Sequence, residues 1–371
     1  MAVATHQSSL SISPESTPAP VPKPTSVKGL VESSVRVDSI PSTFSFNTRA
    51  DDSAASESED SIPVIDFSAL TSDDPRVRSE AIRDLAKACE DWGFFMVVNH
   101  GVTERLMEAV LDGCDRFFNL PDEEKRQFKA KDFWDPLKFG SGVDIKVEKF
   151  FLWRDFLKCY THPEFNFFEV PPGFRDVARE YCTKTREVAR GILRGISQSL
   201  GLEETYIEKE MNFAAGLQIF AANFYPPCPQ PELAIGLPPH TDPGLVTLLI
   251  QNGVAGLQVP APYKDKWVNV DPVPGSIMVH TCDQLEVLTN GRYKSHPHRA
   301  VLNNTTRRIS IAMGNGPSLD TVVAPAPAFV DGERRPAQFT PMKYKEFMEL
   351  QQWVQLKEKT MLDHVRVQAS Q

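Results

Sequence analysis

After about residue 213 the chain breaks into short apolar runs that are separated by glycine, proline and asparagine. The runs are LQIFAANFY, LVTLLI, WVNV, SIMVHT, YKSHPHRAVL and RRISIAMG. Short runs rich in β-branched and aromatic residues are typical of strands. Many short strands punctuated by turns form a sandwich or a barrel. This pattern therefore predicts an antiparallel β core in the C-terminal half of the chain.

The region before this core is predicted to be rich in helices. Apolar residues recur at helical spacing in the segments 75–91 and 103–119, and a longer helix is expected at 173–201. The sequence LPDEEKRQF at 120–128 places acidic residues before basic ones, as a short helix does. Two strand-like runs, IPVIDF and WGFFMVVNHGV, interrupt the helices. The whole pattern predicts a mainly β protein with flanking helices, in the α+β class.

We expect the chain to have four parts. The beginning is rich in serine and proline, cannot bury enough apolar surface to become ordered, and resembles a tail. A plastid transit peptide is the competing interpretation, although no arginine precedes Arg36. A stretch rich in Lys, Glu, Gln and Leu, about 341–365, closes the chain as a helix. The parts are a disordered tail (1–26), a helix-rich N-terminal region (27–212), the β core (213–340) and a C-terminal helix (341–371).

Composition narrows the classes of partner. Lysine and arginine total 40 and aspartate and glutamate total 49, so the formal net charge is −9. This balance argues against a nucleic-acid partner, whose phosphates require a basic face. No apolar run approaches the ~20 residues that span a bilayer. The six cysteines lack CxxC spacing, which is typical of reduced intracellular thiols. We expect a cytoplasmic protein with no nucleic-acid, membrane or obligatory protein partner.

A candidate metal site lies in the β core. His240 and Asp242 are two positions apart, so in an extended segment both side chains point the same way. His298, from a distant strand, is the candidate third ligand. Two histidines and one carboxylate are the ligand set of non-haem iron(II) oxygenases, since they leave coordination sites open. Zinc is less favoured because no general base of the HExxH kind accompanies the pair. For an isolated HxD pair, a hydrogen bond within a loop would be the simpler interpretation.

Arg308 and Ser310 strengthen the metal hypothesis. The segment Asn303-Asn304-Thr305-Thr306 is predicted to be a turn, and a hairpin through it would bring Arg308 beside His298. Arg308 and Ser310 share one face of their strand. A buried guanidinium is costly unless it is paired, and it can clamp a carboxylate through two hydrogen bonds. The pattern predicts a dicarboxylate co-substrate between the metal and Arg308.

With these residues in place, the chain resembles the plant 2-oxoglutarate/Fe(II)-dependent dioxygenases, the family that contains anthocyanidin synthase, flavonol synthase and gibberellin oxidases. The resemblance covers roughly residues 27 to 365. The motifs that carry it are IPVIDF, WGFFMVVNHGV, FFNLPDEEK, NFYPPCPQPE, GLPPHTDPG, NGRYKS, HRAV and RRISIA.

The resemblance implies a double-stranded β-helix, or jelly-roll, core. It implies that iron(II) is bound by His240, Asp242 and His298. It also implies that 2-oxoglutarate is bound by Arg308 and Ser310, with Tyr225 hydrogen-bonding the co-substrate and Asn223 supporting it. The implied reaction consumes O2, decarboxylates 2-oxoglutarate to succinate and oxidises a substrate carbon, with ascorbate as the reductant.

Two other histidines compete for a role. His296 lies two residues before His298 and faces the same way, but the resemblance favours His298 as the ligand, because Arg299 and Ala300 follow it as they follow the family's ligand. His296 is expected near the mouth of the pocket. His280 lies in the run SIMVHT and is expected to be a satisfied core histidine rather than a ligand.

Gly314 and Phe139 are candidates for substrate contact. Gly314 shares a face with Ser310, at a position where many relatives have an aromatic residue, so its small size predicts room for a bulky substrate. A β-bulge at Gly314-Asn315-Gly316 is the alternative. Phe139 precedes Gly140-Ser141-Gly142, in the region that overlies the active site in the family.

We expect an oxidoreductase that hydroxylates a bulky specialised metabolite such as a flavonoid, a phenolic or a terpenoid. A hormone-catabolising dioxygenase is the nearest rival. An oxidase of the aminocyclopropane-carboxylate type would share the iron ligands but use ascorbate in place of 2-oxoglutarate. A jelly roll that binds a metal and a ligand without catalysis is the alternative from another class.

Overall fold

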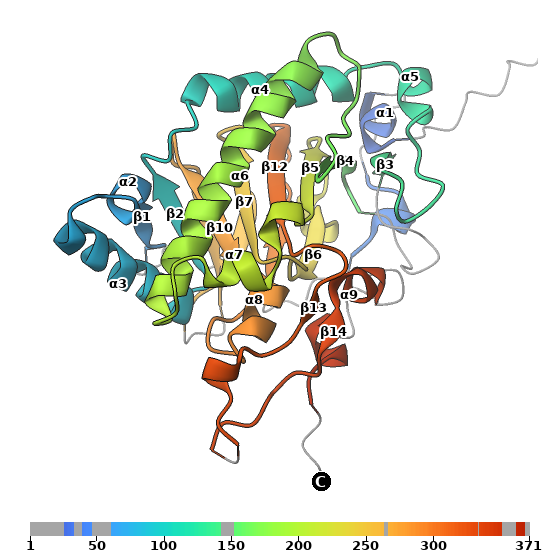
Figure 1. Cartoon of the computed structure of the whole chain (residues 1–371). Coiled ribbons are helices and arrows are strands. Elements are labelled where there is room, and N and C mark those ends of the chain that lie inside the picture. The colour runs from blue at the N-terminus through green and yellow to red at the C-terminus, as the bar shows by residue number, and fades with distance from the viewer. Residues whose placement is uncertain are drawn as a thin grey trace, which may run out of the picture.

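The computed structural model describes residues 26–32, 39–46, 61–141, 152–262, 266–332, 334–350 and 361–367. In this part of the chain, two β-sheets face each other and helices cover the outer side of the larger sheet (Figure 1). The predicted tail, apart from Ser26, lies outside the described residues. No helix within these ranges is long and apolar enough to cross a membrane.

The larger sheet contains eight strands. Their order is β1 (Val64–Asp66), β2 (Phe94–Val98), β10 (Ile277–Thr281), β7 (Val246–Gln251), β12 (Arg308–Asn315), β5 (Gln218–Tyr225), β4 (Asp155–His162) and β3 (Leu137–Ser141). Four of these strands, β1 to β4, belong to the predicted helix-rich region. The N-terminal region and the β core therefore share one sheet, because strands from both parts pair directly.

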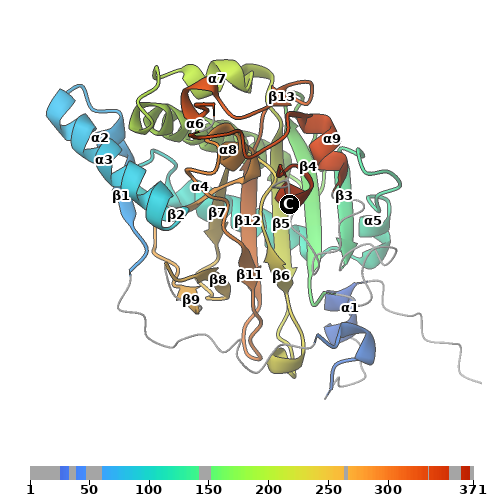
Figure 2. The ribbon, with the colours of Figure 1, turned by 90° about the horizontal axis from the view of Figure 1, so that it is seen from below.

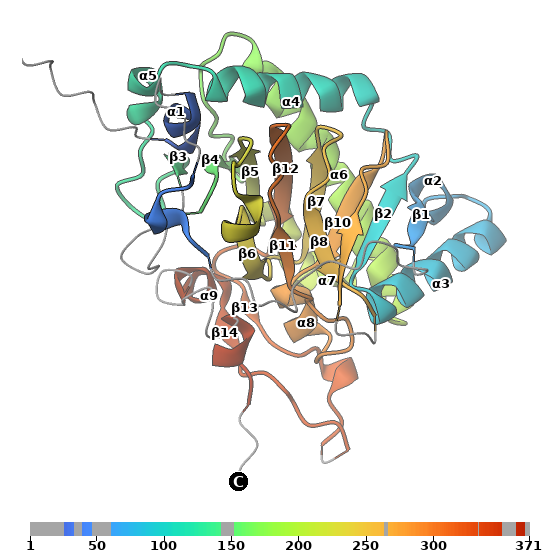
Figure 3. The same cartoon turned by 180° about the vertical axis from the view of Figure 1, so that it is seen from behind.

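The smaller sheet contains four strands, in the order β6 (Leu237–His240), β11 (His298–Ala300), β8 (Leu257–Pro260) and β9 (Trp267–Val270). It lies in front of the larger sheet when the molecule is seen from behind (Figure 3). Apolar residues of both sheets pack between them, including Leu249 and Met278 from the larger sheet and Val259 from the smaller. The pair of facing sheets confirms the predicted jelly-roll core. A two-stranded sheet, β13 (Val322–Val323) and β14 (Met342–Lys343), lies apart from both.

Helices cover the outer side of the larger sheet. The helices α4 (Glu104–Phe118) and α6 (Phe174–Ser199) cross it, and α3 (Pro75–Asp91) packs on α6 (Figure 1). These three confirm the helices predicted from apolar spacing. The remaining helices are short: α1 (Val27–Glu32), α2 (Phe67–Leu70), α5 (Asp122–Arg126), α7 (Tyr206–Glu210), α8 (Asp283–Leu288) and α9 (Tyr344–Leu350). We call the side of the larger sheet under α4 and α6 the helix face, and the side that faces the smaller sheet the site face.

Polar residues fix where the helices begin. The Asp74 carboxylate accepts a hydrogen bond from the Arg76 N–H at 2.8 Å, just before α3. The Thr103 hydroxyl oxygen accepts one from the Leu106 N–H at 3.3 Å, just before α4. Each bond satisfies an N–H group that the helix itself leaves without a partner.

The first helix is tied to the larger sheet. α1 lies beside α5 and the β3 edge (Figure 2). The N–H groups of Val27 and Lys28 donate to the Asp155 carboxylate, at 2.8 and 2.9 Å. Asp155 is fully buried at the start of β4, and burial raises its pKa although these two hydrogen bonds oppose the shift. One carboxylate of β4 therefore anchors the beginning of the described chain.

The predicted hairpin between His298 and Arg308 is wrong. The turn itself exists, since the Asn303 side-chain oxygen accepts hydrogen bonds from the N–H groups of Thr305 and Thr306, at 3.0 and 2.7 Å. However, β11 pairs with β6 and β8 in the smaller sheet, whereas β12 pairs with β5 and β7 in the larger one. The turn therefore crosses from one sheet to the other, and His298 and Arg308 come from opposite layers.

Other differences concern strand and helix ends. The strands β3, β4, β6 and β8 were not among the predicted strand runs, and β11 is only three residues long within the expected run 293–302. The helix expected at 120–128 shortens to α5. In the stretch 341–365, helical structure occurs at α9 and in a 3-10 turn at Met361–His364, and 351–360 lie outside the described residues.

Candidate metal centre

Three side chains that can bind a metal meet at the edge of the smaller sheet. His240 is the last residue of β6, His298 is the first of β11, and the two are paired in register. Asp242 follows in the loop that leads to β7. The loop is held by the start of α8, where the Asp283 N–H donates to the Asp242 carbonyl at 2.9 Å. Strand pairing thus positions the two imidazoles and α8 positions the carboxylate.

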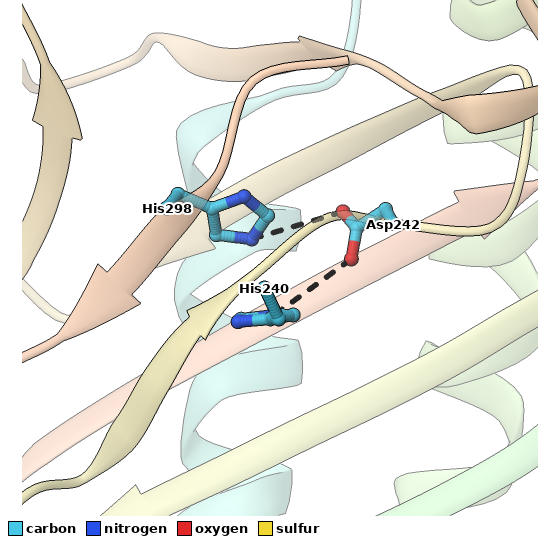
Figure 4. A group of neighbouring side chains, drawn as sticks. All are labelled: His240, Asp242 and His298. Atoms are coloured by element: carbon cyan, nitrogen blue, oxygen red, sulfur yellow. Dashed lines mark ion pairs between the residues drawn. The ribbon is translucent and has the colours of Figure 1, made fainter. Parts of the chain in front are cut away.

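The Asp242 carboxylate lies between the two imidazoles (Figure 4). One of its oxygens is 3.9 Å from His240 Nε2, and the other is 3.9 Å from His298 Nε2. The ligand atoms of the three residues all lie within 4.8 Å of one another. Across the described ranges, no other trio of histidine, cysteine or acidic side chains comes this close. The structure therefore brings the three predicted metal ligands together.

The protonation states suit metal binding. Burial lowers the pKa of His240 and, together with the neighbouring histidines, holds that of His298 well below its usual range. Burial alone would raise the pKa of Asp242, but His298, His280 and His240 outweigh it and hold the pKa far below the usual value. Two neutral imidazoles and one ionised carboxylate are the forms that coordinate a metal.

One hydrogen bond also selects the tautomer of His240. Its Nδ1 lies 2.9 Å from the Pro238 carbonyl oxygen. A carbonyl can only accept, so Nδ1 carries the proton and Nε2 presents its lone pair towards Asp242 and His298. A second residue that orients a ligand in this way is common at metal sites.

His280 lies against the metal group, which the sequence did not indicate. It is buried, as expected for a core position, but within the described residues neither of its ring nitrogens has a hydrogen-bond partner. Its Nδ1 is 3.6 Å from an Asp242 carboxylate oxygen, and its ring centroid is 4.4 Å from that of His298. We predicted a core histidine whose hydrogen bonds are satisfied. The burial is confirmed, but the prediction of satisfied hydrogen bonds is wrong for the described residues. No signal in the run SIMVHT separates this position from an ordinary buried one.

His296 does not belong to the group. Its ring packs at β2, with its centroid 6.3 Å from that of Phe94. A Cβ on Gly93 would lie 2.8 Å from the His296 ring, so the two chain segments are in close contact. The structure therefore places His298, and not His296, beside His240 and Asp242.

Arg308, Ser310, Tyr225 and Asn223 form two neighbouring register pairs on the site face. Arg308 pairs with Tyr225, and Ser310 pairs with Asn223. The Nε and Nη2 groups of Arg308 donate to the Gln251 side-chain oxygen, at 3.1 and 2.9 Å. Its Nη1 is buried and has no partner among the described residues. A buried guanidinium that is held at one end and free at the other is suited to bind an anion.

Two glycines let the smaller sheet approach this group. A Cβ on Gly256 would lie 2.9 Å from Arg308 Cδ, and one on Gly236 would lie 2.7 Å from the Tyr225 ring. Gly236 immediately precedes β6 and Gly256 immediately precedes β8. Arg308 and Tyr225 are therefore enclosed between the two sheets, on the side where the metal group lies.

Arg154 joins this group, although the sequence analysis did not single it out. Its Nη1 donates to the Asn223 side-chain oxygen at 2.5 Å, and its Nε is buried without a partner in the described part of the chain. Burial lowers the pKa of Arg154, while Tyr225 opposes the shift. The tripeptide Trp153-Arg154-Asp155 gives no sequence signal for this role, because the burial of Trp153 and Asp155 is known only from the structure.

Gly314 lies on the site face, as expected. Its strand pairs without interruption with both β5 and β7 through Asn315, which contradicts the alternative of a β-bulge. A Cβ at Gly314 would meet only the Ile219 side chain, at 3.8 Å. Among the described residues, no other atom lies within 4 Å of that Cβ, so there is room for a side chain at this position.

Phe139 lies on the other side of the sheet. Its ring centroid is 6.0 Å from that of Phe117 on α4, and it belongs to the core between the sheet and the helices. The next residue, Gly140, faces the site, where its Cβ would meet the Phe156 ring. The structure contradicts the expected substrate contact of Phe139, because successive strand residues alternate in direction and α4 covers this one.

Comparison with known proteins agrees with this geometry. The sequence matches the model of the 2OG-Fe(II) oxygenase superfamily over residues 216–317, and that of the non-haem dioxygenase in morphine synthesis N-terminal region over residues 62–172. It is 44% identical over 319 residues to 2-oxoglutarate-dependent dioxygenase 19 of Oryza sativa subsp. japonica, which covers 86% of this chain and 94% of the rice protein. The chain belongs to the plant 2-oxoglutarate/Fe(II)-dependent dioxygenases. The enzyme therefore uses iron(II) and 2-oxoglutarate.

Two further relatives of this dioxygenase show the range of the family. Flavanone 3-dioxygenase 3 of Oryza sativa subsp. japonica is 36% identical over 289 residues, which is 77% of this chain and 85% of that protein. The crystal structure of JOX2 in complex with 2OG, Fe and JA superposes with a TM-score of 0.80 at 30% identity, and covers 92% of this chain and 98% of JOX2.

Proposed function

We propose that His240, Asp242 and His298 bind the iron(II) ion and that Arg308 and Ser310 bind the far carboxylate of 2-oxoglutarate. In the same proposal Tyr225 hydrogen-bonds the co-substrate and Asn223 supports it. The observation that carries the assignment is the buried Nη1 of Arg308 on the site face, which has no partner in the described part of the chain and lies opposite two neutral imidazoles and one carboxylate. The residues present fit both groups, since a dicarboxylate has one end for the metal and one for the guanidinium.

Bound iron(II) and 2-oxoglutarate supply the reaction with O2 in which 2-oxoglutarate becomes succinate and CO2 and one oxygen atom enters the substrate. His240, Asp242 and His298 would hold the ion by three ligand atoms, which is the set that leaves room for co-substrates in enzymes of this kind. Gln251 holds Arg308 by two hydrogen bonds, so its free nitrogen is already oriented for a carboxylate. Enclosure between the two sheets limits water around this contact and strengthens it.

We further propose that the substrate is a bulky specialised metabolite, such as a flavonoid, a phenolic or a terpenoid, and that the enzyme hydroxylates it. The open space at Gly314 supports a large substrate, and a relative of 36% identity is a flavanone 3-dioxygenase. A hormone-catabolising role is the second candidate, because the JOX2 complex contains JA. Both candidates use the same iron and 2-oxoglutarate residues.

A metabolite panel tests the proposal. The purified protein would be incubated with Fe(II), 2-oxoglutarate and ascorbate, and each reaction analysed for succinate and for new masses. We expect one class of compound to gain a single oxygen atom with stoichiometric succinate. Absence of succinate across the panel, with 2-oxoglutarate still bound, would support a non-catalytic binding protein instead.

A further inference from the structure

Lys158 is a cation on the site face that neither the iron nor the co-substrate assignment uses. It lies on β4, where the partly exposed residues Phe156 and Lys158 alternate with the buried residues Asp155, Leu157 and Cys159. Phe156 pairs with Asn223 on the site face, so Lys158, two residues later in the same strand, points to that face as well. Its side chain is partly exposed, as is its register partner Ala221.

The residues beside Lys158 form a bare apolar floor. Lys158 pairs with Ala221, Ala221 with Ala312, and Ala312 with Leu249, so the four lie in one row across four strands. Neighbouring strands are ~4.8 Å apart, so Leu249 and Lys158 are three spacings, or roughly 14 Å, apart with the two alanines between them. That width accommodates one or two fused rings. A molecule on this floor would meet apolar side chains along its length and an ammonium group at one end.

The ammonium group of Lys158 has no hydrogen bond or ion pair with any described residue. Lys138, its register partner on β3, differs, because its Nζ contacts the Phe133 carbonyl and the Tyr160 hydroxyl. Burial lowers the pKa of Lys158 to about 8, with Lys138 and Arg154 adding to the shift and Asp242 opposing it. A partly buried cation whose one acidic neighbour is a metal ligand lacks a counter-charge.

When iron(II) and 2-oxoglutarate are bound, the charges of the site sum to a net positive charge. The iron(II) dication and the Arg308 cation balance the Asp242 carboxylate and the 2-oxoglutarate dianion. Arg154 and Lys158 then remain, and both are desolvated. Arg154 is held by Asn223, whereas Lys158 has no anionic partner among the residues that the structure describes.

We propose that Lys158 binds a carboxylate of the substrate, whose apolar body lies on the floor formed by Ala221 and Ala312. This inference rests on the proposed function, because it assumes that the space between the sheets receives the substrate. It narrows the substrate class to ring-containing organic acids. Lys158 is then a residue that determines specificity, and the ion pair forms with little further desolvation because the ammonium group is already partly buried.

The test compares acids with their neutral esters, so that only the charge differs. Protein loaded with Fe(II) and 2-oxoglutarate would be kept free of O2, so that Arg308 is occupied and no turnover occurs. Cinnamate, 2-naphthoate and their methyl esters are the probes, and saturation-transfer NMR gives their dissociation constants. We expect both acids to bind at least about tenfold more tightly than their esters, the effect of one charged hydrogen bond.

Variants then assign the preference to one residue. Lys158→Met and Lys158→Gln should each abolish it, and Lys158→Arg should keep most of it. Lys138→Met is the matched control, since it removes the neighbouring cation whose partners are the chain's own oxygens, and it should change the preference by less than about threefold. Thermal unfolding of each variant verifies that it is folded.

The proposal is overturned if neither acid binds more tightly than its ester, or if both charge-removing variants keep the preference. Binding without O2 is independent of catalysis. A Lys158-dependent preference in a protein that never forms succinate would therefore leave this inference intact and remove the proposed function. Succinate formation without any acid preference would do the reverse.

Discussion

The two faces of the larger sheet are built from alternate residues of the same strands, yet one gathers aromatic rings and the other gathers charged and potential metal-binding side chains. On the helix face, aromatic rings pack closely, as in Phe220, which is fully buried with its ring centroid 5.1 Å from that of Phe167. On the site face, buried nitrogens of Arg308, Arg154 and His280 have no partner in the described part of the chain. The helix face stabilises the fold, whereas the site face keeps polar groups ready for ligands.

This comparison predicts the largest effect at the metal group. We expect His298→Ala to abolish turnover and to lower iron affinity by more than ~100-fold, which exceeds the loss from an outer contact. Anaerobic Fe(II) titration and succinate formation measure the two effects. His296→Ala is the control and should retain both. The opposite pattern would move the third ligand to His296.

A change on the helix face should affect stability and spare the chemistry. We expect Phe220→Ala to lower the free energy of unfolding by ~3–5 kcal/mol, because it leaves a cavity among aromatic rings. Denaturant unfolding measures this loss. The KM for 2-oxoglutarate of the folded variant should stay unchanged, and Ala221→Ser, on the adjacent site-face position, should cost less than ~1 kcal/mol. A large change in KM would show that the two faces are coupled.

Arg307 and Arg308 are adjacent in the sequence but point to opposite sides of the larger sheet, so they compare the two faces directly. Arg308→Met should raise the KM for 2-oxoglutarate roughly 10- to 100-fold, because it removes a charged and buried donor. Arg307→Met removes an exposed guanidinium that binds Asp115 at 2.9 Å on the helix side, and should alter that KM by less than twofold. Steady-state kinetics on both variants decides the matter. Equal effects would contradict the assignment of the co-substrate to the site face.

Filling the space at Gly314 should act on the substrate alone. We expect Gly314→Phe to lower kcat/KM for a bulky substrate by about tenfold or more, the cost of overpacking. Its KM for 2-oxoglutarate should not change. A measured kcat/KM equal to that of the native enzyme would exclude Gly314 from the substrate pocket.

The smallest effect is expected at His280, which acts through Asp242. His280→Leu should weaken Fe(II) binding by about tenfold, in the range seen when an outer partner of a ligand is removed. Co(II) absorption spectra would report the altered geometry, which a purely structural role would leave alone. An unchanged affinity and spectrum would show that the 3.6 Å contact has no positioning role.

The sequence predicted the structure correctly wherever the spacing of residues along a single helix or strand decides which way the side chains point. Helical spacing located α3, α4 and α6, and the two-residue period placed His240 with Asp242 and Arg308 with Ser310. It failed for Phe139, since the segment around Gly140 gives no indication of which residues face inwards, and an error of one position reverses the face. The side chains of His280, Arg154 and Lys158 depend on pairing between distant strands, which no local pattern encodes.

The predicted hairpin after His298 was wrong for a related reason. Asn303 predicts a reversal of the chain, and the reversal occurs. Whether the returning strand joins the same sheet or the opposite one depends on which neighbours are free to pair. In this chain β12 pairs with β5 and β7, and β11 pairs with β6 and β8.

The crossing at that turn divides the chemistry between two layers. The two histidines proposed to bind the metal come from the smaller sheet, and the arginine proposed to bind the co-substrate comes from the larger one, so the distance between the sheets sets the distance between these two groups. Gly236 and Gly256 allow the two sheets to come this close, because any Cβ there would clash with Tyr225 or Arg308. Residues of no chemical function thus set how closely the two layers of the site approach each other.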